Sequence, residues 1–192
     1  MVPDLDDAVV RKAQLGDRRA FELIVEAYRV MVFNYVRRLV KDRTLAEDLT
    51  QEVFLRVYLS LPRFSFQAKF TTWLFQVTKN RVLDELRAQE RRPRSADLSA
   101  DTLHVMDPPA DQGETVDALW RAIDDLDVDL KLAILLRDVA GFSYNEIGEI
   151  LEITLPTVKW RIYKAREGVH ISLARQGLVP ASADEQSSAA AG

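Results

Sequence analysis

Apolar side chains recur at helical spacing from Asp17 to Val40, and this long period constrains the fold more than any other feature of the chain. Asp17 can accept hydrogen bonds from the first free backbone amides and so start a helix. Apolar residues at every third or fourth position place one stripe on one face of that helix. The stripe consists of Phe21, Ile24, Val25, Tyr28, Val32, Val36 and Leu39. The sequence therefore predicts a long helix with one face in a core.

The same spacing predicts three further helices in the N-terminal half. A short one is expected over Leu5–Ala13. Thr44–Glu47 fits a capping box, in which threonine and glutamate satisfy each other's backbone amides, so a helix is expected to start there and to end near Pro62. A fourth helix is expected to begin near Thr71 and to end at Arg91–Arg94.

The C-terminal part predicts four more helices. Ser143–Glu146 fits a second capping box. Thr154 can cap the last helix, and Pro156 is permitted in its first turn because the missing N–H would be unpaired there. The predicted helices begin near Thr115, Asp129, Tyr144 and Thr154 and run to about Leu126, Gly141, Leu151 and Arg175. We therefore expect an all-α fold made of two small helical domains.

Composition excludes several classes of site. The chain has 192 residues, of which 47% are apolar and 29% charged, as is ordinary for a soluble globular protein. It has no cysteine, which excludes disulfides and thiolate metal sites, and His104 and His170 lie too far apart in sequence to favour a zinc site. No cofactor is expected.

Nothing in the sequence favours membrane insertion. No apolar run approaches the roughly 18 residues needed to span a bilayer. The first residues include Asp4, Asp6 and Asp7 and lack the basic-then-apolar order of a signal peptide. We therefore expect a cytoplasmic protein.

Charge is segregated along the chain. Lys and Arg number 9 against 3 Asp and Glu in residues 56–94, 1 against 10 in residues 95–130, and 5 against 1 in residues 156–175. Each basic block is a local footprint for phosphate, although solvated helix faces would look the same. Residues 95–113 are also rich in Pro, Ser and Ala, so we interpret this stretch as a flexible acidic linker.

Aromatic residues alternate with amide, hydroxyl and basic side chains between Phe64 and Arg81. Aromatic faces stack on unpaired bases, amides and hydroxyls contact base edges, and cations hold phosphates. On a helix that begins near Thr71, Trp73 falls on the polar face with Asn80, where it suits a platform for flipped nucleotides. The alternative is that these rings pack the helix against its preceding loop, since aromatic side chains dominate cores generally.

The predicted third helix is apolar on two sides. One stripe faces inward and comprises Leu45, Ala46, Leu49, Val53 and Val57. The opposite face combines acidic, amide and leucine side chains, namely Asp48, Gln51, Glu52, Leu55 and Leu59. Exposed leucines beside acids suggest a docking surface for a basic helix of another protein. Alternatively, the first helix buries Leu55 and Leu59. The acids alone do not support catalysis, because no histidine partner or pocket signature accompanies them.

The last two helices have the pattern of a helix-turn-helix. A short helix and a tight turn precede a longer helix, whose buried stripe is expected to be Leu155, Val158, Ile162, Ala165 and Val169. Its outward face carries polar and aromatic residues between cationic flanks, as in a helix that enters the major groove. A purely structural helical hairpin would show the same pattern.

Six segments in this order carry a family resemblance, and they are Gly16–Phe21, Ala46–Tyr58, Phe70–Phe75, Asn80–Asp84, Tyr144–Ile147 and Thr157–Ile162. Together they resemble the extracytoplasmic-function group of bacterial sigma factors in the sigma-70 family, over nearly everything from Asp7 to Arg175. The resemblance implies a sigma region 2 domain over residues 1–94, a linker over 95–114 and a sigma region 4 domain over 115–176. Residues 177–192 are small and polar, so we expect a disordered tail there. The resemblance implies a transcription initiation factor without enzymatic activity. Its partners would be core RNA polymerase, promoter DNA and an anti-sigma factor.

The resemblance also implies residue roles. The polymerase-binding residues would be Asp48, Gln51, Glu52, Leu55 and Arg56. The readers of the melted minus-ten promoter element would be Phe64, Phe66, Lys69, Phe70, Trp73, Gln76, Lys79, Asn80 and Arg81. The readers of the minus-thirty-five element would be Thr157, Lys159, Trp160, Arg161, Tyr163, Lys164 and Arg166.

Three residues depart from the family's pattern. Gln76 stands where relatives often have arginine, which would weaken a contact to DNA. Glu152 stands where the turn usually has glycine, and a left-handed backbone there would cost about 1 kcal/mol. Trp160 replaces a typically small residue, so the family's minus-thirty-five preference does not transfer.

Two other functions remain open at this point. A conventional repressor or activator would use the C-terminal motif as a dimer on a palindromic duplex, but it would not need Trp73 beside a phenylalanine cluster. A sequestering adaptor would account for the leucine and acid face of the third helix but not for the cationic last helix.

Overall fold

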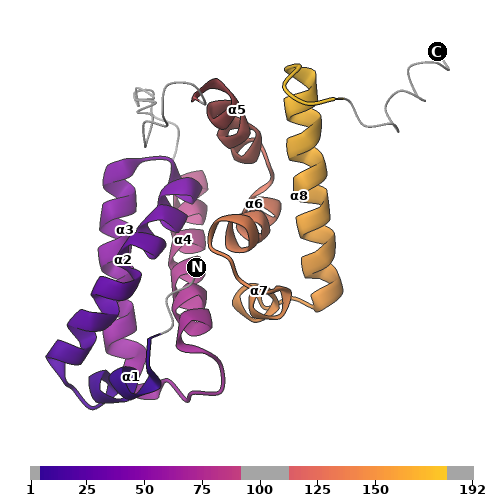
Figure 1. Cartoon of the computed structure of the whole chain (residues 1–192). Helices are drawn as coiled ribbons and strands as arrows, with labels where there is room; N and C mark the ends of the chain where they lie inside the picture. Colours follow the sequence, from indigo (N-terminus) through magenta and orange to yellow (C-terminus); the bar gives the residue numbers. More distant parts are fainter. Residues whose placement is uncertain (1–4, 92–112, 181–192) are drawn as a thin grey trace.

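The computed structural model describes residues 5–91 and 113–180, apart from the side chain of Glu114. All the regular secondary structure within these ranges is helical, which confirms the all-α prediction. The helices form an N-terminal and a C-terminal group that lie side by side (Figure 1). Most of the predicted linker, 95–114, and the end of the predicted tail, 181–192, lie outside the described residues.

The N-terminal domain is a bundle built around its second helix. It contains α1 (Asp7–Gln14), α2 (Arg18–Val40), α3 (Arg43–Ser60), the 3-10 turn η1 (Leu61–Arg63) and α4 (Phe70–Arg91). Helix α2 packs against α1, α3 and α4. The predicted stripe of α2 supplies the centre of this core, where Ile24, Val32 and Val36 have no exposed surface.

The C-terminal domain is built around its last helix. It contains α5 (Gly113–Asp124), α6 (Val128–Ile134), the π-helical turn η2 (Leu135–Val139), α7 (Tyr144–Leu151) and α8 (Leu155–Arg175). Helix α8 packs against α5, α6 and α7. The predicted stripe is confirmed at Val158, Ile162, Ala165 and Val169, whereas Leu155 is 38% exposed because it lies in the first turn, at the edge of the domain.

Two predicted helix caps, Asp17 and Ser143, are confirmed. Asp17 accepts hydrogen bonds from the amides of Arg19 and Ala20, at 2.9 and 3.2 Å. In the second predicted capping box, the Glu146 amide donates to Ser143 Oγ at 3.3 Å, and the Ser143 amide donates to Glu146 Oε2 at 2.8 Å.

The capping box at Thr44–Glu47 is wrong. The N-cap of α3 lies two residues earlier, at Asp42, whose carboxylate accepts a hydrogen bond from the Leu45 amide at 2.8 Å. Glu47 instead pairs with Arg43 at 3.0 Å. The predicted cap at Thr115 is also wrong, since α5 already begins at Gly113.

Two further boundaries differ from the sequence prediction. The helix expected to run to Gly141 passes into a π-helical turn after Ile134. The tail was expected to be disordered from residue 177, but the structure describes it as far as residue 180. Within it, the Leu178 amide donates to the Leu173 carbonyl at 3.1 Å.

Helix α3 keeps its second apolar side in solvent. Leu55 and Leu59 are 58% and 68% exposed, so the first helix does not bury them. Leu49, on the opposite side of the same helix, has no exposed surface.

The two domains share an apolar contact. The ring of Phe75 on α4 meets the ring of Phe142, which precedes α7, with centroids 4.8 Å apart, and neither residue has any exposed surface. The guanidinium of Arg38 on α2 lies 3.3 Å from the ring centroid of Trp120 on α5. The relative position of the domains is therefore fixed by packed side chains in this structure.

Leu49→Ala is predicted to lower the free energy of unfolding by about 2 to 5 kcal/mol, because it leaves a cavity in the core. The matched change Leu55→Ala, on the exposed side of the same helix, is predicted to shift it by no more than about 0.5 kcal/mol. Urea denaturation followed by circular dichroism measures both. Equal losses for the two variants would contradict the assignment of the buried side of α3.

Candidate nucleic-acid and partner interfaces

Four aromatic rings cluster where η1 leads into α4. The Phe64 ring contacts those of Phe66, Phe70 and Trp73, with centroids 4.6, 5.8 and 5.0 Å apart. Phe64 and Phe70 are only 6% and 5% exposed, whereas Phe66 and Trp73 are half-buried. The packing interpretation is confirmed for Phe64 and Phe70, which form a buried support, whereas base contact at Phe66 and Trp73, which retain some surface, stays a prediction.

The loop that carries Phe66 is held by residues that the sequence did not single out. The side-chain amide of Gln14 on α1 donates to the carbonyls of Leu61 and Phe64, at 3.0 and 2.8 Å. The guanidinium of Arg11 lies 4.0 Å from the centroid of the Phe66 ring. Phe66 has a φ of 58°, a left-handed conformation that costs a residue with a Cβ about 1 to 2 kcal/mol. No local pattern marks Gln14, because its acceptors lie about fifty positions away.

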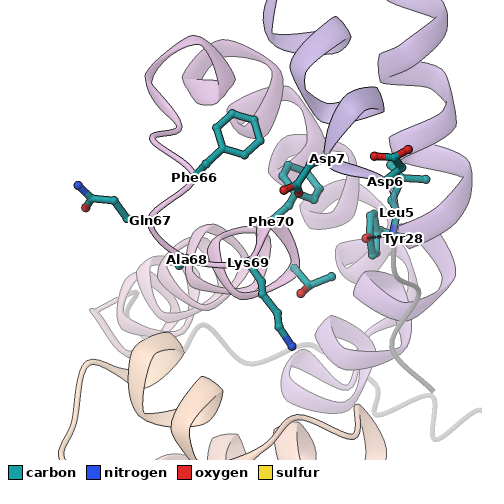
Figure 2. Close-up of a pocket in the computed structure, with 10 residues that line it drawn as sticks. Leu5, Asp6, Asp7, Tyr28, Phe66, Gln67, Ala68, Lys69 and Phe70 are labelled. Carbon is teal, nitrogen blue, oxygen red and sulfur yellow. Dashed lines mark hydrogen bonds between the residues drawn. The ribbon is translucent and has the colours of Figure 1, made fainter.

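A cavity of about 630 Å³ opens between this loop and the start of the chain (Figure 2). Its lining comprises Leu5, Asp6, Asp7, Tyr28 and the consecutive residues 66–71. Sequence reasoning missed the first four of these, which come close to the loop only through folding. Trp73 and Asn80 are not part of this lining. The lining holds two carboxylates, Asp6 and Asp7, and one ammonium group, Lys69, which is paired with Glu146. The excess of negative charge disfavours a phosphate here, whereas a flat, uncharged ring can pack against the aromatic side chains.

Most of the predicted minus-ten donors are engaged within the protein. Lys69 pairs with Glu146 at 2.8 Å and Lys79 pairs with Glu152 at 3.0 Å. The side chain of Gln76 donates to the backbone carbonyl of Glu149 at 2.7 Å. Asn80, by contrast, is exposed. The three acceptors all belong to α7 or the residue that follows it.

Arg81 joins α4 to α3. Its guanidinium contacts Glu52 at 2.5 Å and Glu85 at 3.0 Å. The hydrogen bond with Glu52 is the largest influence raising the pKa of Arg81, and the same bond holds the pKa of Glu52 below its ordinary value. A predicted DNA contact is thus tied directly to a predicted polymerase contact.

The predicted polymerase-binding residues share one surface of α3. All five are exposed, and they are Asp48, Gln51, Glu52, Leu55 and Arg56. Tyr58 and Leu59 extend this surface with 41% and 68% of their area exposed. The combination of acids and exposed apolar side chains fits a partner helix that is both basic and amphipathic.

Helix α8 presents the predicted major-groove face to solvent. Trp160 and Tyr163 are 57% and 63% exposed. The cations around them are paired: Arg161 with Asp129 at 2.6 Å, Lys164 with Glu167 at 2.5 Å, and Arg166 with Asp138 at 2.6 Å. Lys159 is exposed, and Thr157 shares a hydrogen bond of 2.8 Å with Thr154.

The turn between α7 and α8 sets the angle of this motif. Glu152 has a φ of 58°, so the left-handed conformation considered from sequence is present. A Cβ at Gly148 would lie 3.1 Å from the carbonyl oxygen of Ile153, closer than most such contacts. A small residue at position 148 therefore lets the turn fold back against α7.

Other classes of site find no support in the part of the chain that the structure describes. Residues 5–91 and 113–180 hold no cluster of three or more His, Asp or Glu side chains that could bind a metal ion. Within the same ranges, no helix combines the length and the apolar character that crossing a bilayer requires.

Family comparisons cover both domains. The protein-family model for sigma-70 region 2 matches residues 24–92, and the protein-family model for sigma-70 region 4 matches residues 117–167.

Curated relatives extend this likeness along most of the chain. The chain is 34% identical to the ECF RNA polymerase sigma-E factor of Haemophilus influenzae over 174 residues, which is 84% of this chain and 92% of that protein. It is 34% identical to the sigma-E factor of Escherichia coli over 85% of this chain and 92% of that one. It is 30% identical to the RNA polymerase sigma-H factor of Pseudomonas aeruginosa over 90% of this chain and 96% of that one.

Solved structures show the same fold. CnrH, in complex with the cytosolic domain of CnrY, matches with a TM-score of 0.68 and 20% identity, covering 88% of this chain and 97% of that one. The sigma factor RpoE from Bartonella quintana, in complex with the anti-sigma factor NepR, matches with a TM-score of 0.69 and 21% identity, covering 80% and 96%.

Gln14→Ala is predicted to lower the free energy of unfolding by about 1 to 2 kcal/mol, since two carbonyls lose their donor. The loss should be local, so hydrogen exchange of the amides in residues 64–70 should accelerate more than exchange elsewhere. Gln89→Ala, at an exposed position of α4, is the control and should change neither quantity. Unchanged exchange in the loop of the Gln14 variant would show that this side chain does not hold it.

Proposed function

The chain belongs to the extracytoplasmic-function group of the sigma-70 family, and from this premise we propose that it is the subunit that gives RNA polymerase its promoter specificity. It binds core polymerase, recognises two promoter elements and promotes strand separation. The observation that carries this proposal is the division of surfaces: an exposed helix-turn-helix on one domain, and an aromatic loop beside an exposed docking face on the other.

The helix-turn-helix is assigned to duplex DNA at the minus-thirty-five element. A helix that enters a major groove needs side chains for base edges in its centre and cations at its sides. Trp160 and Tyr163 supply the exposed centre of α8, and Lys159, Arg161 and Arg166 supply the sides. The ion pair of Arg166 lies at the surface, where such pairs contribute about 0 to 1 kcal/mol, so a phosphate can replace its carboxylate. Arg161 is partly buried, but its partner Asp129 is exposed.

The aromatic loop and α4 are assigned to the melted minus-ten element. Any base can stack on Phe66 and Trp73, because every base has a flat face. Stacking favours unpaired strands, whose bases are free to leave the duplex stack. The cavity beside the loop has room for one flipped base, and its acidic rim would keep the phosphate outside. Phe64 and Phe70 are assigned a supporting role in this reader because they are buried.

The exposed face of α3 is assigned to core polymerase. Asp48, Glu52 and Leu55 together offer charge and apolar area to a partner helix. Because Glu52 also binds Arg81, docking at α3 and strand contact at α4 are expected to influence each other. The chain itself is assigned no bond chemistry, since RNA synthesis belongs to its partner.

Control by an anti-sigma factor follows from the family and from the solved relative that binds NepR. A promoter-specificity subunit acts where transcription takes place, so we place this chain in the cytoplasm with polymerase and DNA. The domain boundaries proposed from sequence are 1–94 and 115–176. The last helix of the first proposed domain, α4, ends at Arg91, and the first helix of the second, α5, begins at Gly113.

Reconstitution with core RNA polymerase tests the proposal as a whole. Purified chain and core enzyme are mixed with genomic DNA of the source organism, and the start sites of the transcripts are mapped. The expected result is a set of start sites absent from core enzyme alone. A chain that neither associates with core polymerase nor changes where transcripts begin would overturn the proposal.

Two variants separate the proposed surfaces. Trp73→Ala is predicted to retain polymerase association and to lose strand separation, because one stacked base contributes about 1 to 3 kcal/mol, or roughly a 5- to 150-fold effect. Asp48→Lys is predicted to weaken polymerase association, because it reverses a charge on the docking face.

Co-elution on size exclusion measures association, and permanganate reactivity of unpaired thymines measures strand separation. Glu22→Lys, an exposed acid on α2, is the charge-matched control for Asp48→Lys. If Trp73→Ala opened promoters as well as the original chain, the assignment of the minus-ten reader would be wrong.

A further inference from the structure

Helix α7 lies against α4 (Figure 1). Three donors of the N-terminal domain meet three acceptors of the C-terminal domain. Lys69 meets the carboxylate of Glu146, Gln76 meets the backbone carbonyl of Glu149, and Lys79 meets the carboxylate of Glu152. Glu146 and Glu149 are in α7, and Glu152 is the residue that follows its last turn.

Lys79 is the most deeply buried of the three donors, whereas the side chain of Lys69 is exposed. Lys79 is only 5% exposed, although the carboxylate that neutralises it is on a side chain that is 68% exposed. A lysine so deeply buried requires a partner, since an unpaired buried charge is strongly unfavourable. In this structure the ammonium group is bound to Glu152, so a DNA phosphate would have to displace that carboxylate.

Glu152 takes part in the contact at a conformational cost. Its left-handed backbone would suit glycine without strain, and a side chain there costs about 1 kcal/mol. Glycine would make the same turn but would leave Lys79 without a carboxylate.

Glu146 has two roles in the same contact. It closes the capping box of α7 through Ser143, and it binds Lys69. Burial alone would raise the pKa of Glu146, but the hydrogen bonds from Lys69 and Ser143 outweigh burial and lower it. The carboxylate is therefore charged near neutral pH, as an ion pair with Lys69 requires.

Apolar and cation-π contacts hold the same two domains together. Phe75 and Phe142 are completely buried against each other, and Arg38 covers the ring of Trp120. The contact of α7 with α4 is thus part of a packed interface and not an isolated set of surface ion pairs.

We propose that α7 is an internal competitor of the minus-ten strand: in this closed state its acceptors occupy Lys69, Gln76 and Lys79, and DNA binds there only after the two domains separate. The inference rests on the proposed function, because it assigns those three residues to DNA. The state is selective. Trp160 and Tyr163 of α8 are exposed in it, so the duplex-reading face stays open, whereas three donors of the strand-reading face are bound to the C-terminal domain.

The chain offers substitutions that remove the ion pairs and keep α7 folded. In Glu146→Gln, glutamine can still close a capping box but carries no charge. In Glu152→Gly, the carboxylate is lost and the left-handed strain is relieved. The control is the double variant Glu22→Gln with Glu149→Gln, which removes the same number of negative charges. Both control residues are exposed, and Glu149 contacts Gln76 only through its backbone.

Two measurements on the full chain test the proposal. The first is energy transfer between dyes on cysteines introduced as Leu15→Cys and Gln176→Cys, which label cleanly because the chain has no other cysteine. The second is fluorescence anisotropy of a labelled single-stranded oligonucleotide that carries the non-template strand of a promoter mapped in the reconstitution. The Glu146→Gln, Glu152→Gly variant is expected to show lower transfer and roughly five- to tenfold tighter binding of the strand, since more of the chain is open. The control should show neither change.

The outcomes distinguish this inference from the proposed function. Unchanged transfer in the test variant would show that these contacts do not hold the domains closed, and lower transfer without tighter binding would show that α7 does not compete with the strand. Either result overturns the inference while start-site mapping with polymerase still supports the function. Equal tightening in the control would attribute the gain to net charge and also overturn the inference. If the chain fails to redirect transcription, the function fails, and the transfer measurement still reports whether the domains close.

Discussion

Burial of one side of α4 positions the rest of the molecule. Leu74 and Phe75 have no exposed surface, and they fix α4 against the N-terminal bundle and against Phe142 of the other domain. The side chains on the buried side of α4 are used for packing, so only the remaining side chains of this helix can make its other contacts. In α4 they comprise Trp73 beside the aromatic loop, Arg81 toward α3, and Gln76 and Lys79 toward α7.

Carboxylates in this chain neutralise the cations proposed to bind DNA. Arg81 binds Glu52 and Glu85, Lys79 binds Glu152, and Arg166 binds Asp138. The chain has a formal charge of −4, and these cations are each neutralised by carboxylates of the same chain. Exposed pairs of this kind are weak and screened by salt, so a polyanion that brings several phosphates at once can displace them. The pair of Lys79 differs because the lysine itself is buried, although Glu152 is exposed, and in the proposed closed state its exchange requires the two domains to move apart.

Two residues with a Cβ adopt left-handed backbone conformations near proposed functional surfaces. Phe66 bends the aromatic loop, where Arg11 covers its ring, and Glu152 closes the turn before α8. Each costs free energy that the surrounding packing must offset. In both cases the strained backbone directs a side chain to a specific partner, the cation of Arg11 for Phe66 and the ammonium of Lys79 for Glu152.

The sequence by itself determined the all-α fold, the buried stripes of α2 and α8, and the caps at Asp17 and Ser143, because these depend on residues a few positions apart. It also placed Leu55 and Trp160 on exposed faces through the same periodicity. The sequence offered both Asp42 and Thr44 within the same short stretch, and the prediction chose the wrong one as the cap of α3. Only the tertiary structure decided that Phe64 and Phe70 lie inside while Phe66 keeps some surface, and that Gln14 holds the loop. It alone brought Glu146 and Glu152 to Lys69 and Lys79, across more than seventy positions of chain. Such pairings depend on how helices pack in space, and helical spacing within one segment carries no record of which distant segment will lie against it.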